Sequence, residues 1–401
     1  MERRTFFSGL LKVQPTSGQE QFFPRIEALR GLSALVVAAD HAWQSPWRDA
    51  SGITLSFIPS TAEGVYGGWT TTILSVFGNG LAAVDVFFVI SGFVLLQSLM
   101  RAGDCSWANV FRFIVARLFR IFPAAVVTIG IFVLVFCATG SSLSGPGVYE
   151  PLIVLRNALL IDSSITGVMW TLRIEVIAIP LLILGFVLYR SFGIVGLTVL
   201  LSTLIGLAAT SIWTHLIDTP FGLGVLQFFG VGMLVFGVGV QPWMRRSHIA
   251  TLVLVVAIAL TLSAWSLPRF GVRAHHIEMA CDAVIVGLLA FGSLGALGKF
   301  FDHPVVRFYG RISYSFYLLN ALTLLLFWHI PEVLGRVMQT QIPGAVVALG
   351  MFAISVLVTT PAAWLMYKYV ERPGILAGRM LLDNLRLTVL RIGSANAARG
   401  R

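Results

Sequence analysis

Long apolar runs occupy most of this chain and restrict it to a membrane-embedded fold. Only 11% of its 401 residues are charged, whereas about 25% are charged in a typical soluble domain. In a bilayer the backbone polar groups must be satisfied within the segment, which favours helices. Runs long enough to cross a hydrocarbon layer of about 30 Å occur at residues 28–46, 81–99, 118–139, 169–189, 193–214, 222–240, 249–267, 279–298, 311–330 and 344–368. The sequence therefore predicts an all-α, polytopic transmembrane bundle of about ten spans.

Basic residues are distributed unevenly between the flanks of these runs. One set of flanks holds most of the 28 lysines and arginines. The other set holds only Arg48, Arg156, Arg173, Arg269, Arg273 and Arg336. Because positive charge accumulates on the cytoplasmic side, we expect both termini in the cytoplasm. The formal charge of +10 is typical of a membrane surface facing the cytoplasm, so we expect the bilayer as a partner and no nucleic acid.

The chain divides into one large membrane domain with short ends. We predict a cytosolic arm at residues 1–24, a membrane-embedded domain at 25–373 and a basic cytosolic tail at 374–401, with an amphipathic part near 380–392. The three cysteines form no even framework, so we expect neither disulfides nor a metal site. The outer segments 47–80 and 140–168 are long enough to cover a site, and the glycine-rich run 221–240 favours close helix packing.

Arg30 and His41 stand out because they are ionisable groups in the first apolar run. Eleven residues advance an α-helix by about 1100°, so both side chains project from nearly one face, about 16 Å apart along the axis. The face between them carries small apolar residues, so it forms a track with an always-charged group at one end and a titratable base at the other. Alternatively, Arg30 extends to the membrane surface and His41 packs near the opposite one.

The predicted topology sorts the other ionisable groups by depth. His41, Asp85 and Glu175 fall in the outer half, whereas Asp40 points about 100° away from His41 on the same helix. At the inner end lie Arg30, Arg117, Arg120 and Arg311. Arginines suit phosphate oxygens, although ordinary anchoring at the inner surface would also explain them.

Together these positions fit a donor that carries phosphates and has a long arm. Coenzyme A has both, so its phosphates would meet the arginines while its pantetheine arm reached towards His41. The histidine would then deprotonate an acceptor hydroxyl, with Glu175 or Asp85 orienting its ring.

Six motifs in order, between residues 26 and 373, resemble those of acyltransferase family 3, integral membrane proteins that transfer acyl groups, usually acetyl, to surface glycans and other hydroxyl acceptors. They are Arg30 and His41 in the first run, VDVFFVISGF at 84–93, RLFRIFP at 117–123, WTLRIE at 170–175, GRISYSFYL at 310–318 and ERP at 371–373. Two places differ. Asn320 stands where the family often has histidine, and residues 176–179 are apolar where a polar or aromatic stretch is usual.

The resemblance implies that His41 is essential, that Arg30, Arg117 and Arg120 are important, and that acyl-CoA is the donor. Ser91 and Ser313 would be acyl carriers if a covalent intermediate formed, although helix packing and backbone bonding by a small hydroxyl explain both better. We place Trp170, Ser313 and Tyr314 at the acceptor site, with Trp170 able to stack on a sugar ring.

We therefore expect an O-acyltransferase of a bacterial cytoplasmic (inner) membrane that uses acetyl-CoA or another acyl-CoA as a substrate and acylates a carbohydrate. It needs no permanently bound cofactor. The competing hypothesis is a transporter or flippase for a lipid-linked sugar or small hydrophobic compound, whose intramembrane charges would form a path. A membrane scaffold is a third hypothesis, but it leaves the ionisable groups unexplained. The sequence leaves open the acceptor, the acyl length and whether the protein is a homodimer.

Overall fold

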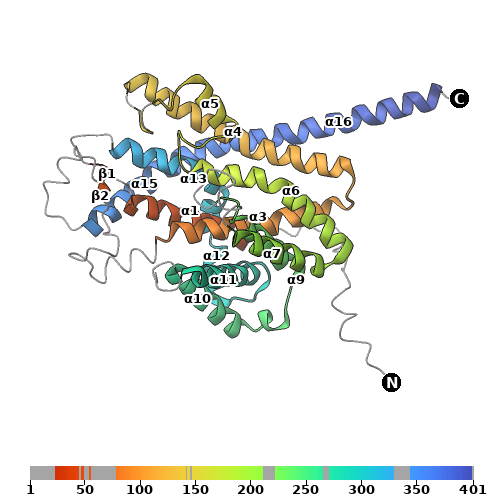
Figure 1. Ribbon diagram of the computed structural model, residues 1–401, viewed down its shortest axis with the longest axis horizontal. Coiled ribbons are helices and arrows are strands. Elements are labelled where there is room, and N and C mark those ends of the chain that lie inside the picture. Colours follow the sequence, from red (N-terminus) through yellow and green to blue (C-terminus); the bar gives the residue numbers. More distant parts are fainter. Residues whose placement is uncertain are drawn as a thin grey trace.

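The computed structural model describes residues 23–44, 47–48, 54–55, 78–140, 142–144, 147–210, 222–264, 271–328 and 344–399. Nearly all of these residues are helical (Figure 1). The helices are α1 (Pro24–Gln44), α3 (Gly80–Ala102), α4 (Trp107–Thr139), α5 (Pro151–Ala158), α6 (Met169–Phe192), α7 (Ile194–Ala208), α9 (Leu226–Val238), η1 (Pro242–Arg245), α10 (Ser247–Ala264), α11 (Gly271–Phe291), α12 (Gly295–Asp302), α13 (Pro304–Trp328), α15 (Gly344–Met366), η2 (Tyr367–Glu371) and α16 (Arg372–Arg399). Two short strands, β1 (Trp47–Arg48) and β2 (Thr54–Leu55), pair antiparallel. The all-α prediction is confirmed for the described part of the chain.

Each of the ten predicted apolar runs overlaps a helix, but these helices differ in their capacity to cross a membrane. By length and composition, the described helices at Gly80–Ala102, Trp107–Thr139, Met169–Phe192 and Ala348–Leu385 qualify. A fifth span would come from His275–Phe291 with Gly295–Asp302, a pair bent by 83°. Helix α1 carries Arg25, Glu27, Arg30 and Asp40, which makes it too charged to qualify. The apolar helices indicate an integral membrane protein, while ten spans and cytoplasmic termini stay predictions.

Glycines let two pairs of helices approach closely at the centre of the bundle. Helix α1 packs along α13, where a Cβ on Gly31 would clash with the backbone of Tyr309 and Gly310. Helix α3 packs along α9, where a Cβ on Gly232 would clash with the backbone of Val89 and Phe93. The prediction that the run 221–240 supports close helix packing is thus confirmed.

The C-terminal part of the chain is one long helical stretch. Helix α15 continues through the π-helical turn η2 into α16, so the predicted boundary at residue 374 falls within a helix. The beginning of α16 packs on α4, where Gly374 and Gly378 lie against Pro123 and Phe119. Beyond that contact α16 extends away from the bundle to the C-terminus (Figure 1).

Other predicted segments meet the structure only in part. The predicted arm lies almost entirely outside the described residues, as does most of the outer segment 47–80. The second outer segment, 140–168, contains α5 and then leads into α6.

Candidate functional site

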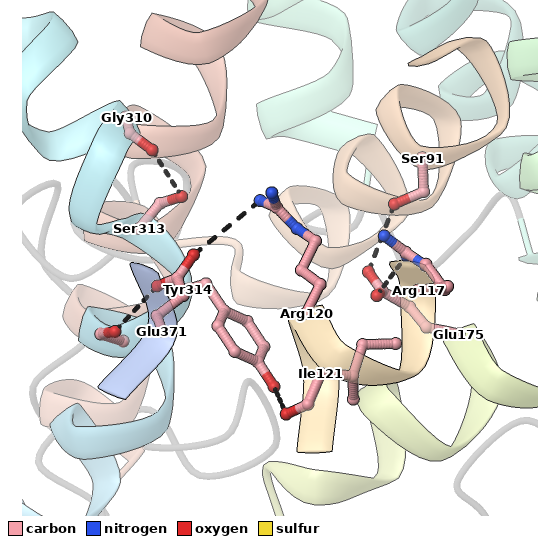
Figure 2. Close-up of polar contacts among 10 residues, drawn as sticks. Ser91, Arg117, Arg120, Ile121, Glu175, Gly310, Ser313, Tyr314 and Glu371 are labelled. Atoms are coloured by element: carbon pink, nitrogen blue, oxygen red, sulfur yellow. Dashed lines mark hydrogen bonds and ion pairs between the residues drawn. The ribbon is translucent and has the colours of Figure 1, made fainter. Parts of the chain in front are cut away.

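A partly buried ion pair joins α4 to α6. Nη2 of Arg117 lies 2.5 Å from Oε2 of Glu175, and Ser91 of α3 donates its hydroxyl to the other carboxylate oxygen at 3.2 Å. Figure 2 shows the three side chains meeting between their helices. Glu175 is therefore held by two partners from two other elements.

One turn further along α4, Arg120 turns to a second carboxylate. Its Nη2 lies 4.0 Å from Oε1 of Glu371, a residue of η2 with only 2% of its side chain exposed. Ser315 donates to the other Glu371 oxygen at 2.9 Å. Tyr314 donates its hydroxyl to the carbonyl of Ile121 at 2.7 Å, which ties α13 to α4 beside this pair. Figure 2 shows Glu175 and Glu371 flanking the two arginines from opposite sides.

Arg30 of α1 completes this group, which we call the arginine–glutamate network (Arg30, Arg117, Arg120, Glu175 and Glu371). Its guanidinium interacts electrostatically with all four other members. The network contains three cationic and two anionic side chains, so it keeps one net positive charge when both carboxylates are ionised. A partly buried site with excess positive charge attracts anions.

Arg311, predicted to belong with these arginines, is exposed on α13. Within the described part of the chain, Arg311 forms no ion pair with the arginine–glutamate network.

A cavity lies at the opposite end of α1. It has a volume of about 440 Å³, and His41 and Asp40 line it together with Val84 of α3, Trp170 of α6 and Tyr317 of α13. Val37, one turn before His41, also lines it. Because Arg30 precedes His41 by eleven residues, the arginine–glutamate network and the imidazole are separated by about 16 Å along α1. The cationic network and the cavity thus lie at opposite ends of α1, and a track for the donor between them stays a prediction.

His41 has an amide neighbour in this region. The side chain of Asn320, which is 1% exposed, lies close enough to interact with the imidazole. Neither amide atom of Asn320 nor Nδ1 of His41 has a hydrogen-bond partner of good geometry among the described residues. Unpartnered buried polar atoms are costly, so this pair is suited to a polar group entering the cavity.

The predicted orienting carboxylates do not gather around His41 in the way the topology suggested. Both oxygens of Glu175 are engaged by Arg117 and Ser91. Asp85 interacts with Glu278 and Asp282 instead. Arg117 was expected at the inner end of a span that begins near residue 118, far from Glu175. Because α4 begins at Trp107, Arg117 lies ten residues inside the helix and reaches the depth of Glu175. The chemical roles of His41, Glu175 and Asp85 stay predictions.

The predicted acceptor residues fall in different places. Trp170 lines the cavity. Tyr314 lies beside the arginine–glutamate network, and the hydroxyl of buried Ser313 donates to the carbonyl of Gly310 within its own helix at 2.8 Å. Glu371 has no predicted role, although it lies in the ERP motif, and Tyr317 of the SYSFYL segment, which was expected to pack, lines the cavity.

Comparisons with known proteins agree with one another. A family model described as an acyltransferase domain matches residues 23–368. The chain is 24% identical over 339 residues to "Putative acetyltransferase ORF330" of Acidianus two-tailed virus, covering 81% of this chain and 88% of that protein. No solved structure matches the chain.

Proposed function

Because the chain belongs to acyltransferase family 3, we propose that this acyltransferase moves an acyl group, with acetyl as the first choice, from acyl-CoA to a hydroxyl of a cell-surface or secreted carbohydrate. We place it in a bacterial cytoplasmic membrane. The observation that carries the proposal is the arrangement along α1, with the arginine–glutamate network at Arg30 and the cavity at His41.

The arginine–glutamate network suits the donor. Phosphates of coenzyme A would take the surplus positive charge, and forked guanidinium groups match phosphate oxygens. Glu175 and Glu371 hold Arg117 and Arg120 in place before the donor arrives. A pre-organised site pays less ordering entropy when the ligand binds.

The cavity suits the transfer step. A neutral His41 takes the proton of the acceptor hydroxyl, whose oxygen attacks the thioester carbonyl carbon. The carbon–sulfur bond breaks, and the leaving thiolate takes the proton back from the imidazolium to give free coenzyme A. Trp170 offers an aromatic face to a sugar ring. Direct transfer is favoured over an acyl-enzyme because the hydroxyls of Ser91 and Ser313 are engaged elsewhere.

The donor assignment is tested by acetyl-CoA binding to the purified protein. Arg120→Gln removes one cation of the arginine–glutamate network, and we expect its affinity to fall about tenfold, since a charge-assisted hydrogen bond contributes about 1.5 kcal/mol or more. Arg156→Gln on α5 is the matched control, because Arg156 is exposed and has no part in the arginine–glutamate network. Equal affinity of both variants and wild type would remove the support for a phosphate site.

The catalytic assignment needs a separate variant. We expect His41→Ala to bind acetyl-CoA normally and to lose about 10²- to 10⁴-fold in transfer rate, the usual contribution of a general base. A variant that transfers acetyl at the wild-type rate would show that His41 is not the base.

A further inference from the structure

A second group of ionisable side chains lies between α3 and α11, apart from the arginine–glutamate network. Asp85 of α3 and His275 and Glu278 of α11 each offer one donor atom, and these atoms lie within 4.8 Å of one another. Asp282, one turn after Glu278, interacts electrostatically with both Glu278 and Asp85. We call these four residues the carboxylate–histidine cluster.

The three carboxylates of the cluster are buried, and His275 is partly buried. Glu278 is 2% exposed, Asp282 is 0% exposed and Asp85 is 9% exposed. Oε1 of Glu278 and Oδ2 of Asp282 have no hydrogen-bond partner among the described residues. Thr261 of α10 donates to the other oxygen of Asp282 at 3.2 Å, so only part of the acceptor capacity is used.

The negative charge of the three carboxylates in this cluster requires a neutralising positive charge. Among the described residues, no arginine or lysine forms an ion pair with Asp85, Glu278 or Asp282. Three ionised carboxylates at this separation repel one another and are poorly solvated. Either protons or a bound cation must neutralise them.

The histidine favours a metal ion over protons alone. His275 and Glu278 are three residues apart on α11, so both side chains face α3 together with Asp282. The side-chain amide of Gln227 on α9 lies 2.9 Å from Nε2 of His275, and with its oxygen turned towards the ring it accepts the Nε2–H and leaves the Nδ1 lone pair free for a metal ion. Metal-binding histidines usually have such a hydrogen-bond partner at the ring nitrogen that does not bind the metal, because this partner fixes the tautomer and the orientation of the ring.

We propose that Asp85, His275 and Glu278 bind a divalent transition-metal ion, with Asp282 as a further oxygen donor. One imidazole and several carboxylates are the ligand set of ions such as Zn²⁺ and Mn²⁺. Ligand atoms about 2.1 Å from one ion lie roughly 3 to 4 Å apart, so a small contraction of the cluster completes the coordination. The prediction that the chain has no metal site was drawn from its three cysteines alone, and this proposal differs from it because the ligands here are carboxylates and a histidine.

The site has a structural consequence for the cavity. Asp85 directly follows Val84, which lines the cavity beside His41. An ion at the cluster fixes the first turns of α3 against α11 and so holds that wall of the cavity in place. It contacts neither donor nor acceptor, and its existence does not depend on the proposed function.

The test is metal analysis of the purified full-length protein in detergent. Protein stripped with a chelator and then dialysed against Zn²⁺ or Mn²⁺ at micromolar concentration is expected to retain about one ion per chain. Glu278→Gln and His275→Ala are expected to retain less than a tenth as much. The matched controls are Glu150→Gln and His248→Ala, which change exposed residues outside the cluster and are expected to bind like wild type.

Thermal unfolding gives an independent readout that needs no variant. Chelation is expected to lower the melting temperature of the wild-type protein, and the metal that binds should restore it. Wild-type protein that retains no ion and melts at the same temperature with and without chelator would overturn the proposal and leave protons as the neutralising charge. Full binding by folded Glu278→Gln and His275→Ala would overturn it as well.

Discussion

Side chains one turn apart on α4 make different pairs, and these pairs decide which residues are available for chemistry. Arg117 is paired with Glu175, whereas Arg120 lies at a longer 4.0 Å from Glu371 and is 36% exposed. Arg120 is therefore freer to meet an incoming phosphate, while Arg117 is fixed by its partner. The serines near these groups are similarly committed to hydrogen bonds.

The serines give the first prediction at this scale. Ser313→Ala removes only a hydroxyl that bonds the carbonyl of Gly310, so we expect transfer within about threefold of wild type. Ser91→Ala loses one hydrogen bond to Glu175, which costs about 1 kcal/mol of stability, and is also expected to stay active. Steady-state assays of both variants with acetyl-CoA check this. Loss of activity comparable to that of His41→Ala in either variant would instead identify an acyl carrier.

Asn320 gives the second prediction. Its amide lies beside His41, so Asn320→Ala is expected to lower kcat roughly tenfold with little change in KM, as loss of about one hydrogen bond would. Asn320→His restores a polar side chain and should recover part of the rate. Steady-state kinetics give kcat and KM for both variants. The histidine variant separates positioning from misfolding, because a purely structural defect would reduce the amount of folded enzyme and would not be rescued by histidine. Equal kcat in Asn320→Ala and wild type would exclude a positioning role.

At the level of residues, sequence reasoning located the groups better than it located their partners. Of the four arginines expected together, Arg30, Arg117 and Arg120 do gather, whereas Arg311 lies exposed on α13. The partner of Arg117 was not foreseen, because the true start of α4 moves Arg117 deeper along the helix than its predicted span allowed. The cluster around Asp85 was missed because Asp85 and Glu278 are almost two hundred residues apart and only packing brings α3 against α11.

Helix contacts form the next scale, where glycines set the separation of α3 and α9. A Cβ on Gly232 would press against the backbone oxygen of Val89, and backbone cannot rotate away as a flexible side chain can. Gly130 of α4, by contrast, has nothing within 4 Å of an added Cβ. The two positions therefore form a matched pair.

We expect Gly232→Ala to destabilise the protein by about 1 to 3 kcal/mol through overpacking. Gly130→Ala should be neutral or more stable by up to about 1 kcal/mol, because alanine is the better helix former. Thermal unfolding of both purified variants in the same detergent compares them. If Gly232→Ala were as stable as Gly130→Ala, the close approach of α3 and α9 would be refuted.

Elements were more predictable than their ends. All ten apolar runs overlap helices because continuous hydrophobicity over about twenty residues is a strong signal. The bend between α11 and α12 was not predicted, since glycines recur through the run 279–298 and the segment Gly292–Gly295 at the bend differs from the rest of the run only slightly. The join of α15 to α16 was also missed, because the predicted tail begins at residue 374, whereas Pro373 lies in the first turn of α16, where proline fits.

At the scale of the whole molecule, the predicted topology assigns opposite sides to two exposed sites. Cys105 lies in the loop between α3 and α4, on the arginine-rich side, and Arg156 lies on α5 of the second outer segment. With Cys137 and Cys281 replaced by serine, a membrane-impermeant maleimide should label Cys105 in inverted vesicles and not in spheroplasts. The same reagent should label Arg156→Cys, in a chain without other cysteines, in spheroplasts only. The reverse pattern would invert the topology and the proposed side of donor entry.

Acyl transfer to a carbohydrate with His41 as the base is tested most directly by mass spectrometry of surface and secreted glycans. A strain lacking this protein is complemented with wild type or with His41→Ala, and the glycans of the two strains are compared. We predict that glycans from the strain with wild type are heavier by one acyl unit, most simply acetyl, than glycans from the strain with His41→Ala. Glycans that are present and identical in both strains would contradict a carbohydrate acceptor, and glycans missing or retained inside the mutant cells would favour a transporter.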